Sequence, residues 1–475
     1  MYEEKNTDGI FFIRRVAIFF GTIAAVVAVA LIIILVVPEP EQPETREQRA
    51  ARIDAERQAF SESLTREQLL YDFDYFMYVL EHNFPFFGVA YRRHGADIIA
   101  LGAELRIRLE EETDHITATD FNRMLWTYIF TPVNRLGHLH SIGRAVYINI
   151  LSNSIEFDSP INVYVREMIE RNPNIRQFYG DVDYYDIEAA FNAVWRNPGN
   201  ITTEIVEEGR IAYMHIQRMV AQVQPCDIVA VRSLYTRIAD FEHLIIDIRG
   251  NGGGNWWYPH DIVTIPHFNS FRNFGLRMTT RYVVFYKGGE HNLNFLETLY
   301  SSRRIPRTLR PSHFSNSGFV VENNTVTGRH NMQRIQNSEQ MVWEDLEALD
   351  YYHMSEFIVR QWQPQFQSNF TGQMWLLIDG GVASASAQFA NFYRYNDLAI
   401  LVGEVAGGSF GSPGMESKFF SLPNTGIIVR YDIGMAVCRR TGRILEEGVL
   451  PHYFNRPGMD ALETTLALIE EGWYR

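Results

Sequence analysis

One serine of this chain stands where a protein can turn a hydroxyl group into a nucleophile. Ser384 lies in the run Gly-Gly-Val-Ala-Ser-Ala-Ser-Ala at residues 380–387, directly after the apolar segment 375–378 and before residues 388–395, which have the apolar spacing of a helix. This order predicts a strand-to-helix junction, where backbone N–H groups at the positive end of a helix can stabilise a developing oxyanion. The same position also suits a plain helix N-cap, because serine is a preferred capping residue. Ser386, two residues deeper into the helix, is the weaker nucleophile candidate.

A glycine-rich turn follows another predicted strand. The apolar segment 244–248 leads into the sequence Asp-Ile-Arg-Gly-Asn-Gly-Gly-Gly at residues 247–254. Consecutive glycines let the backbone approach a ligand closely, and their N–H groups can form an anion-binding nest, which in an acyl-transfer enzyme is half of an oxyanion hole. A turn with no ligand is the alternative interpretation. A phosphate-binding P-loop is excluded because no Gly-Lys-Ser/Thr sequence follows.

A histidine is the usual base that takes the proton of a nucleophilic serine, and His138 in Leu-Gly-His-Leu-His is the candidate. An ordinary loop histidine is one alternative. Metal binding through His138 and His140 is another, but no further Asp, Glu or His stands at a suitable spacing. We therefore expect no metal ion and no cofactor.

Composition restricts the class of protein and its location. Apolar residues make up 46% and the net charge is -14, without the Lys and Arg clusters that nucleic-acid binding needs.

Residues 16–37 form 22 positions without a charge, long enough for a membrane-spanning helix. Arg14 and Arg15 precede this segment and no signal-peptidase site ends it, so we expect an uncleaved anchor in the cell membrane with the remaining chain extracytoplasmic. Cys226 and Cys438 are compatible with one disulfide or with two thiols.

The elements that must position these residues fall into two regions. The sequence Thr-Arg-Glu-Gln at residues 65–68 has capping-box spacing and opens an amphipathic helix, and a second helix follows Thr117. From about residue 205 the pattern changes to strands alternating with helices, including strands at 210–216 and 399–402, which is typical of βαβ units. The long segment 258–370 between strands has no assigned role.

Three ordered blocks resemble the C-terminal processing peptidase and tricorn-core family of serine peptidases. The blocks are Leu-Gly-His at 136–138, the strand and glycine turn at 244–254, and the Ser384 run followed by Leu-Val-Gly-Glu at 401–404. The closing segment Glu-Glu-Gly-Val-Leu-Pro at 446–451 is also similar, so the resemblance covers about residues 65–475.

The resemblance implies a site and a mechanism. The processing-protease branch pairs its serine with a lysine 25 residues downstream, but Ser409 stands there and Lys418 falls in the next strand. The tricorn-like branch uses a Ser–His pair with a Glu behind it, which implies Ser384 as nucleophile, His138 as base and Glu446 or Glu447 as the orienting carboxylate. The implied oxyanion hole consists of the N–H groups of Gly252 or Gly253 and of Ala385. Residues 141–205 lack the carboxylate-binding loop of a PDZ domain.

The resemblance also implies an α/β fold, with a ClpP/crotonase-like βα superhelix as its core. The expected function is a membrane-anchored serine peptidase that cleaves peptides or proteins through an acyl-enzyme; the alternative is an inactive peptidase-like protein that binds peptide or lipid. The expected organisation is a cytoplasmic tail 1–15, a transmembrane helix 16–37, a linker 38–64, a helical domain 65–140, a connecting segment 141–204 and a peptidase core 205–475.

Overall fold

The computed structural model describes most of the chain beyond its first 43 residues. The described residues are 44–112, 115–156, 159–183, 186–188, 200–219, 225–268, 278–286, 290–292, 295, 319–322, 325–328, 351–359, 366–408, 417–438 and 443–472. The predicted membrane segment 16–37 lies outside them, as does Ser409. Among the helices that the structure describes, none qualifies as a membrane span. The chain divides into two compact units, Met1–Ala55 and Glu56–Arg475, and the elements that concern the site belong to the second.

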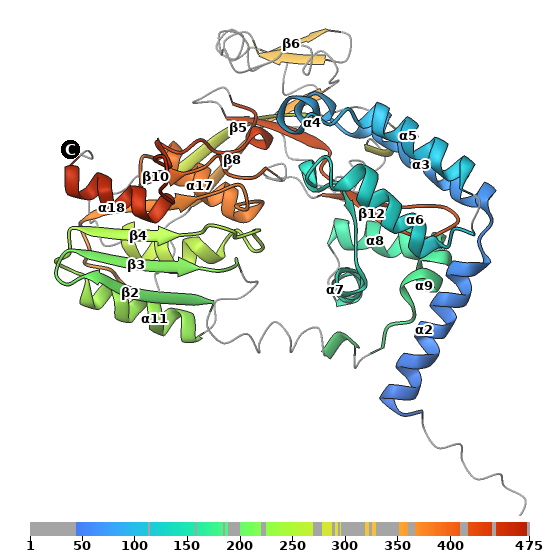
Figure 1. Cartoon of the computed structure of the whole chain (residues 1–475), viewed down its shortest axis with the longest axis horizontal. Coiled ribbons are helices and arrows are strands. Elements are labelled where there is room, and N and C mark those ends of the chain that lie inside the picture. The colour runs from blue at the N-terminus through green and yellow to red at the C-terminus, as the bar shows by residue number, and fades with distance from the viewer. Residues whose placement is uncertain are drawn as a thin grey trace, which may run out of the picture. The chain divides into compact units, whose positions relative to one another are not determined.

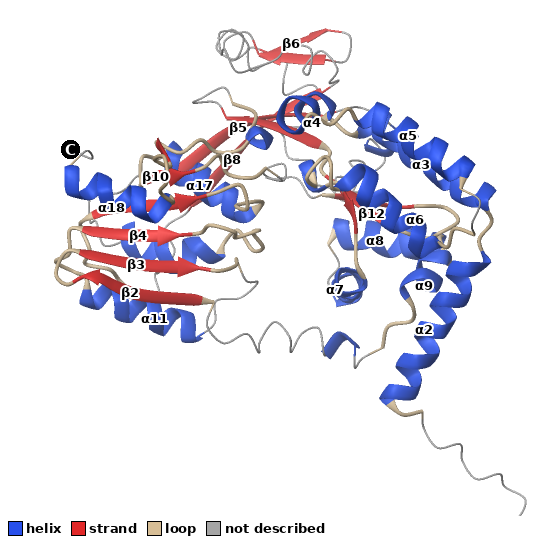
Figure 2. Ribbon diagram, in the orientation of Figure 1, coloured by secondary structure: helices blue, strands red, loops and turns tan. Residues whose placement is uncertain are grey.

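A six-stranded mixed sheet with the strand order β14-β10-β9-β4-β3-β2 carries the two glycine-containing loops (Figures 1 and 2). Its strands are β2 (Ile201–Glu207), β3 (Ile211–Ile216), β4 (His243–Asp247), β9 (Gln373–Ile378), β10 (Ile400–Gly403) and β14 (Tyr453–Phe454). All neighbours are parallel except β2 and β3. The predicted strands and their parallel βα arrangement are therefore confirmed. Because β4 and β9 are parallel neighbours, the loops that follow them meet at one edge of the sheet.

Helices cover both faces of this sheet, which explains why its central strands read as continuous apolar runs. On one face, Leu244, Leu376 and Leu401 belong to a core that includes side chains of α11 (Pro225–Arg237) and α17 (Ala385–Tyr395). On the other face, Ile245 and Leu377 pack with side chains of α18 (Ala461–Glu471). The strand that ends before Ser384 is thus buried on both sides and gives the loop that carries Ser384 a rigid base.

The N-terminal part is helical, and its first predicted caps are present. Thr65 caps α3 in a complete capping box with Gln68, and Thr117 caps α6 in another. The helices of this part are α2 (Arg46–Ser63), α3 (Arg66–Asn83), α4 (Phe87–His94), α5 (Ile98–Glu111), α6 (Ala118–Leu125), α7 (Arg144–Glu156), α8 (Pro160–Arg171) and α9 (Asn174–Tyr179). A π-helix, η1 (Trp126–Phe130), and a 3₁₀ turn, η2 (Leu136–His138), follow α6.

Strands from the far end of the sequence complete the core of this helical part. The sheet β1-β12-β11 joins β1 (His140–Ser141) to β12 (Ile428–Tyr431) and β11 (Lys418–Ser421). In its register His140 lies opposite Arg430. One apolar cluster contains both Leu136 and Ile428. The segment around residue 138 is therefore held by residues almost 300 positions later.

The remaining described elements lie between β4 and β9 or between β12 and β14 in the sequence. They are η3 (His260–Thr264), α12 (Ile265–Phe268), an antiparallel sheet of β13 (Gly434–Cys438), β5 (Met278–Tyr286) and β8 (Tyr351–Val359), a hairpin of β6 (Phe319–Glu322) and β7 (Thr325–Gly328), and the 3₁₀ turn η5 (Leu445–Glu447). Cys226 is an exposed free thiol.

Candidate active site

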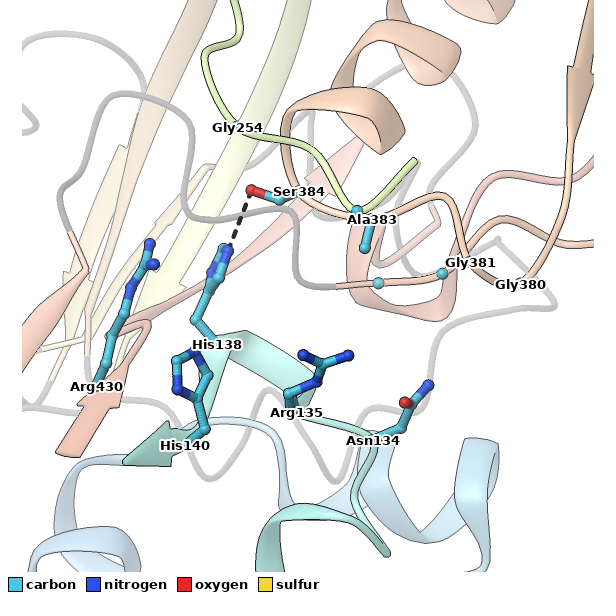
Figure 3. A pocket seen from close by; sticks show the side chains of 13 residues that line it. Asn134, Arg135, His138, His140, Gly254, Gly380, Gly381, Ala383, Ser384 and Arg430 are labelled. Atoms are coloured by element: carbon cyan, nitrogen blue, oxygen red, sulfur yellow. Dashed lines mark hydrogen bonds between the residues drawn. The ribbon is translucent and has the colours of Figure 1, made fainter. Parts of the chain in front are cut away.

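Ser384 and His138 lie within reach of each other across a cleft of about 430 Å³ (Figure 3). The distance from Ser384 Oγ to His138 Nε2 is 3.2 Å. Ser384 is the residue before α17, but its side chain makes no capping hydrogen bond. The N-cap interpretation of Ser384 is therefore not supported, because its hydroxyl group is turned toward the imidazole instead of the helix.

The backbone at Ser384 has an unusual conformation that presents the side chain to the cleft. Its φ of 55° and ψ of -126° lie outside the regions that L-residues commonly adopt. The carbonyl of Gly408 accepts a hydrogen bond from the Ser384 N–H at 3.2 Å, and the Ser384 carbonyl accepts one from Gln388 in the first turn of α17. These bonds hold the strained residue between two loops and the start of a helix.

The glycine turn after β4 supports this conformation. A Cβ atom added to Gly253 would lie 2.7 Å from Ser384 Cβ and 2.6 Å from the Ala383 carbonyl oxygen. Gly253 also has a φ of 93°, which favours glycine. Asp379 Oδ1 accepts hydrogen bonds from the N–H groups of Gly250 and Gly381, both at 2.9 Å, and so ties the two loops together.

Ser386 is fully buried and has a structural role. Its hydroxyl group donates to the Ala383 carbonyl at 2.6 Å, lies within hydrogen-bonding distance of the Asn251 carbonyl and accepts from the Ala383 N–H at 3.1 Å. It therefore fastens the loop of Ser384 to the glycine turn, away from the cleft.

The second ring nitrogen of His138 contacts a carboxylate that the sequence analysis did not identify. Asp432 follows β12, is 2% exposed, and its Oδ2 lies 2.7 Å from His138 Nδ1. Burial opposes ionisation of this carboxyl group, but the charges of His138 and Arg430 and the hydrogen bonds from His138 and Ser417 outweigh it and lower the pKa of Asp432. An ionised Asp432 can only accept, so Nδ1 carries the proton and Nε2 is left to accept from the Ser384 hydroxyl group.

Asp432 is itself fixed by two further hydrogen bonds. Its Oδ1 accepts from the Ser417 hydroxyl group at 2.5 Å, and its backbone N–H donates to the Gly137 carbonyl at 2.7 Å. Arg430 Nη2 donates to Ser417 Oγ at 2.9 Å. The carboxylate therefore has a defined orientation relative to the imidazole.

Glu446, the carboxylate that the family resemblance implied, does not contact the His138 ring. Its Oε2 accepts from the Gly137 N–H at 3.4 Å, one residue before His138. The neighbouring Glu447 forms an ion pair with Arg92 at 2.8 Å. The geometry therefore does not support Glu446 as the carboxylate that orients His138: Asp432 contacts the imidazole, whereas Glu446 contacts the backbone of the turn that carries His138.

The ammonium group of Lys418 bonds to a group other than Ser384. Its side chain is 1% exposed, and its ammonium group donates to the His291 carbonyl. Burial lowers the pKa of Lys418 to about 7. Lys418, the first residue of β11, is therefore part of the protein core.

Two backbone N–H groups near Ser384 suit an oxyanion. Ala385 is the first residue of α17, where N–H groups have no acceptor within the helix. Gly252 lines the cleft together with Ser384. The N–H of Gly253, in contrast, donates to Asn251 Oδ1 at 2.9 Å and so serves the turn.

Backbone strain is concentrated around this cleft. Among the described residues, the non-glycine positions with positive φ are Asn134, Arg135, His138, Ser384 and Asp397, and all except Asp397 line the cleft. Such conformations cost about 1 kcal/mol or more each and persist only where the surrounding structure enforces them. Within the described ranges no group of three His, Cys, Asp or Glu side chains is arranged to hold a metal ion.

The sequence profile of peptidase family S41 matches residues 210–454, just over half of the chain. No curated protein sequence matches. Among solved structures, the chain is similar to a candidate peptidase from Parabacteroides merdae ATCC 43184, with 14% identity, a TM-score of 0.44 and coverage of 85% of this chain and 95% of that one. Mature CPAF shares 13% identity with a TM-score of 0.41, and the match covers 82% of this chain and 93% of that one. The photosystem II D1 C-terminal processing protease shares 14% identity with a TM-score of 0.28, and the match covers 55% of this chain and 49% of that one. Because these TM-scores lie below 0.5, the assignment of the chain to a family rests on the match to the family profile.

Proposed function

The chain belongs to peptidase family S41 and is a serine-type peptidase, and we propose that Ser384, His138 and Asp432 form its catalytic triad. The observation that carries this proposal is the continuous set of contacts from the Asp432 carboxylate through His138 to the Ser384 hydroxyl group, at 2.7 and 3.2 Å. Both distances lie within hydrogen-bonding reach, which lets His138 take the Ser384 proton and lets Asp432 orient His138.

The proposed reaction follows from these contacts. His138 Nε2 takes the proton of Ser384 Oγ while Oγ attacks the carbonyl carbon of the scissile peptide bond. The N–H groups of Gly252 and Ala385 stabilise the negative oxygen, and ionised Asp432 stabilises the imidazolium that forms. His138 then gives the proton to the leaving amine, which departs and leaves an acyl-enzyme on Ser384. His138 next removes a proton from water, whose oxygen attacks the ester carbon. The bond to Ser384 Oγ then breaks, His138 returns the proton to Oγ, and the acid product leaves the restored enzyme.

Covalent labelling and kinetics test the triad directly. In the full-length protein in detergent, a fluorophosphonate should label Ser384, and Ser384→Ala and His138→Ala should each lower kcat by at least about 10⁴-fold. Unchanged peptide cleavage in both variants would exclude the mechanism. Absence of labelling in a correctly folded wild type would favour the alternative of an inactive protein that binds peptide or lipid.

We further propose that residues 16–37 anchor the protein in the cell membrane and that the catalytic part is extracytoplasmic. The support is the uncharged 22-residue segment with Arg14 and Arg15 before it. The core is proposed to be of the ClpP/crotonase-like type, and the substrate a peptide or protein. Fractionation of cells, followed by protease digestion from the outer side, should find the full chain in the membrane fraction and its catalytic part accessible. Recovery in the soluble fraction would exclude the anchor.

A further inference from the structure

The two walls of the cleft differ in what they offer a substrate. In the wall formed by the loops after β4, β9 and β10, the described lining residues are glycines with Ala383 and Ser384, none of which has a long side chain. The opposite wall carries all the larger lining residues: Asn134, Arg135, His138, His140 and Arg430. Among the described lining residues, those that can distinguish one substrate side chain from another therefore belong to this second wall.

The charge of the second wall is positive. Arg135 and Arg430 line the cleft, none of the described lining residues is a carboxylate, and Asp432 is buried behind His138. Burial, together with the charges of Arg430, His138 and Arg135, lowers the pKa of His140 to about 4, so His140 is neutral at pH 7. The positive lining contrasts with the net charge of -14 of the whole chain. The cleft therefore favours anions because of its local charge, not because of the charge of the protein.

Both arginines are positioned by the elements that position the base. Arg430 lies in β12, opposite His140, and its Nη2 donates to Ser417 Oγ at 2.9 Å. Arg135 stands three residues before His138 with a φ of 54°. Figure 3 shows the two guanidinium groups on either side of the His138 side chain. Ser417 holds the guanidinium group of Arg430, which can therefore bind a carboxylate at a lower entropic cost than a freely rotating side chain.

We propose that Arg135 and Arg430 bind a carboxylate of the substrate and make this peptidase selective for peptides that present a carboxylate close to the scissile bond. The inference deepens the proposed peptidase function and rests on it. The carboxylate has two sources: an Asp or Glu side chain near the scissile bond, or the free C-terminus of the peptide. Both present the same planar group, which a guanidinium recognises through paired, charge-assisted hydrogen bonds.

The test compares matched peptides with the full-length protein in detergent. A fluorogenic peptide that the enzyme cleaves is made with Glu or Gln at each position around the scissile bond, and each version is made with a C-terminal carboxylate or carboxamide. Loss of the recognised carboxylate should lower kcat/KM about tenfold or more at low salt. A drop for Gln peptides identifies the side chain as the source, and a drop for carboxamides identifies the C-terminus.

Variants assign the preference to the two arginines. Arg135→Gln and Arg430→Gln should each reduce the ratio of kcat/KM between carboxylate and neutral peptides, whereas Arg430→Lys should retain part of it. Arg135→Glu should shift the preference toward Lys-containing peptides. Arg171→Gln removes the same charge from an exposed position on α8 and should leave the ratio unchanged.

Two outcomes would contradict the inference, and both differ from failure of the peptidase function. If wild type labels at Ser384 and cleaves all matched peptides equally well, the carboxylate preference is excluded and the peptidase function stands. If both Gln variants label at Ser384, and are therefore folded, but keep the carboxylate preference, the role of the two arginines is excluded and the peptidase function stands. If wild type neither labels nor cleaves any peptide, the proposed function fails and this inference fails with it.

Discussion

Asp432 Oδ2 lies 2.7 Å from His138 Nδ1, although 294 positions separate the two residues in the sequence. The contact fixes which nitrogen of the imidazole carries the proton and so which one faces Ser384. It exists because β12, which ends directly before Asp432, pairs with β1, which begins two residues after His138. The geometry of the proposed base is therefore a property of a long-range strand pair.

Asp432→Asn should lower kcat by roughly 10⁴-fold with little change in folding. An amide at this position can donate to Nδ1 and so favours the tautomer with the proton on Nε2, which cannot accept from Ser384. Steady-state kinetics and the rate of fluorophosphonate labelling measure the effect. Glu446→Gln is the matched control and should lower kcat far less, because Glu446 contacts the Gly137 backbone. Equal losses in both variants would contradict the assignment of Asp432.

Ser417→Ala should lower kcat by about tenfold, because the Asp432 carboxylate loses a charge-assisted hydrogen bond. KM should change little, since we place Ser417 behind Asp432 as a positioning residue. Ser417→Thr retains a hydroxyl group and should restore part of the rate. Ser152→Ala removes a hydroxyl group that bonds only within α7 and serves as the control. A Ser417→Ala enzyme with unchanged kcat would show that the other contacts of Asp432 suffice.

Gly253→Ala should reduce labelling of Ser384 strongly. The new methyl group would lie less than 3 Å from atoms of Ala383, Ser384 and Ala385, so the strained conformation of Ser384 must change. Gly209→Ala is the control, because Gly209 also has a positive φ, of 75°, but has open space around its Cβ position. Comparison of the two variants separates the cost of the backbone conformation from the clash. Normal labelling of Gly253→Ala would mean that the loop can shift without moving the nucleophile.

The stability of the protein should rise between pH 7 and 9.5 through Lys418. Its pKa is lowered to about 7 by burial, whereas the unfolded chain holds this proton to about pH 10.5. In this interval the unfolded state binds more protons than the folded state, so the free energy of unfolding increases with pH. The contribution is on the order of 3 kcal/mol. Below pH 7 both states are protonated and the destabilisation is complete.

Urea denaturation at several pH values measures this contribution. Lys418→Met fills the same buried space without a charge, so it should be more stable than wild type at pH 7, and the difference should shrink as the pH rises to 9.5. The comparison cancels the other groups that titrate in this interval. A constant difference between the two proteins across the interval would show that Lys418 does not titrate there.

The extent to which the sequence predicted this site depends on how local each signal is. Ser384 and the glycine turn follow buried strands within a few residues, so the pattern of apolar runs and small residues reveals them. His138 was found because a serine needs a base and because the Gly-His pair resembles the family's own. In each case a short stretch of sequence contains the evidence.

Asp432 had no such signal. It lies in the sequence Ile-Val-Arg-Tyr-Asp-Ile-Gly, where a single acidic residue beside a strand is ordinarily assigned to the surface. Its burial and its contact with His138 result from the pairing of β12 with β1 and from the hydrogen bond of Ser417, which only the folded chain brings together. The resemblance of the closing segment to the family points to Glu446 instead, because similarity in sequence does not specify which atoms a carboxylate reaches.

The pairing of β1 with β12 also affects how the protein is made. A growing chain contains His138 and Ser384 long before it contains residues 428–432, so the contact that orients the base forms only when translation is nearly finished. Until then the serine has no correctly held partner. The complete set of contacts from Asp432 to Ser384 therefore cannot form before nearly the whole chain has been synthesised.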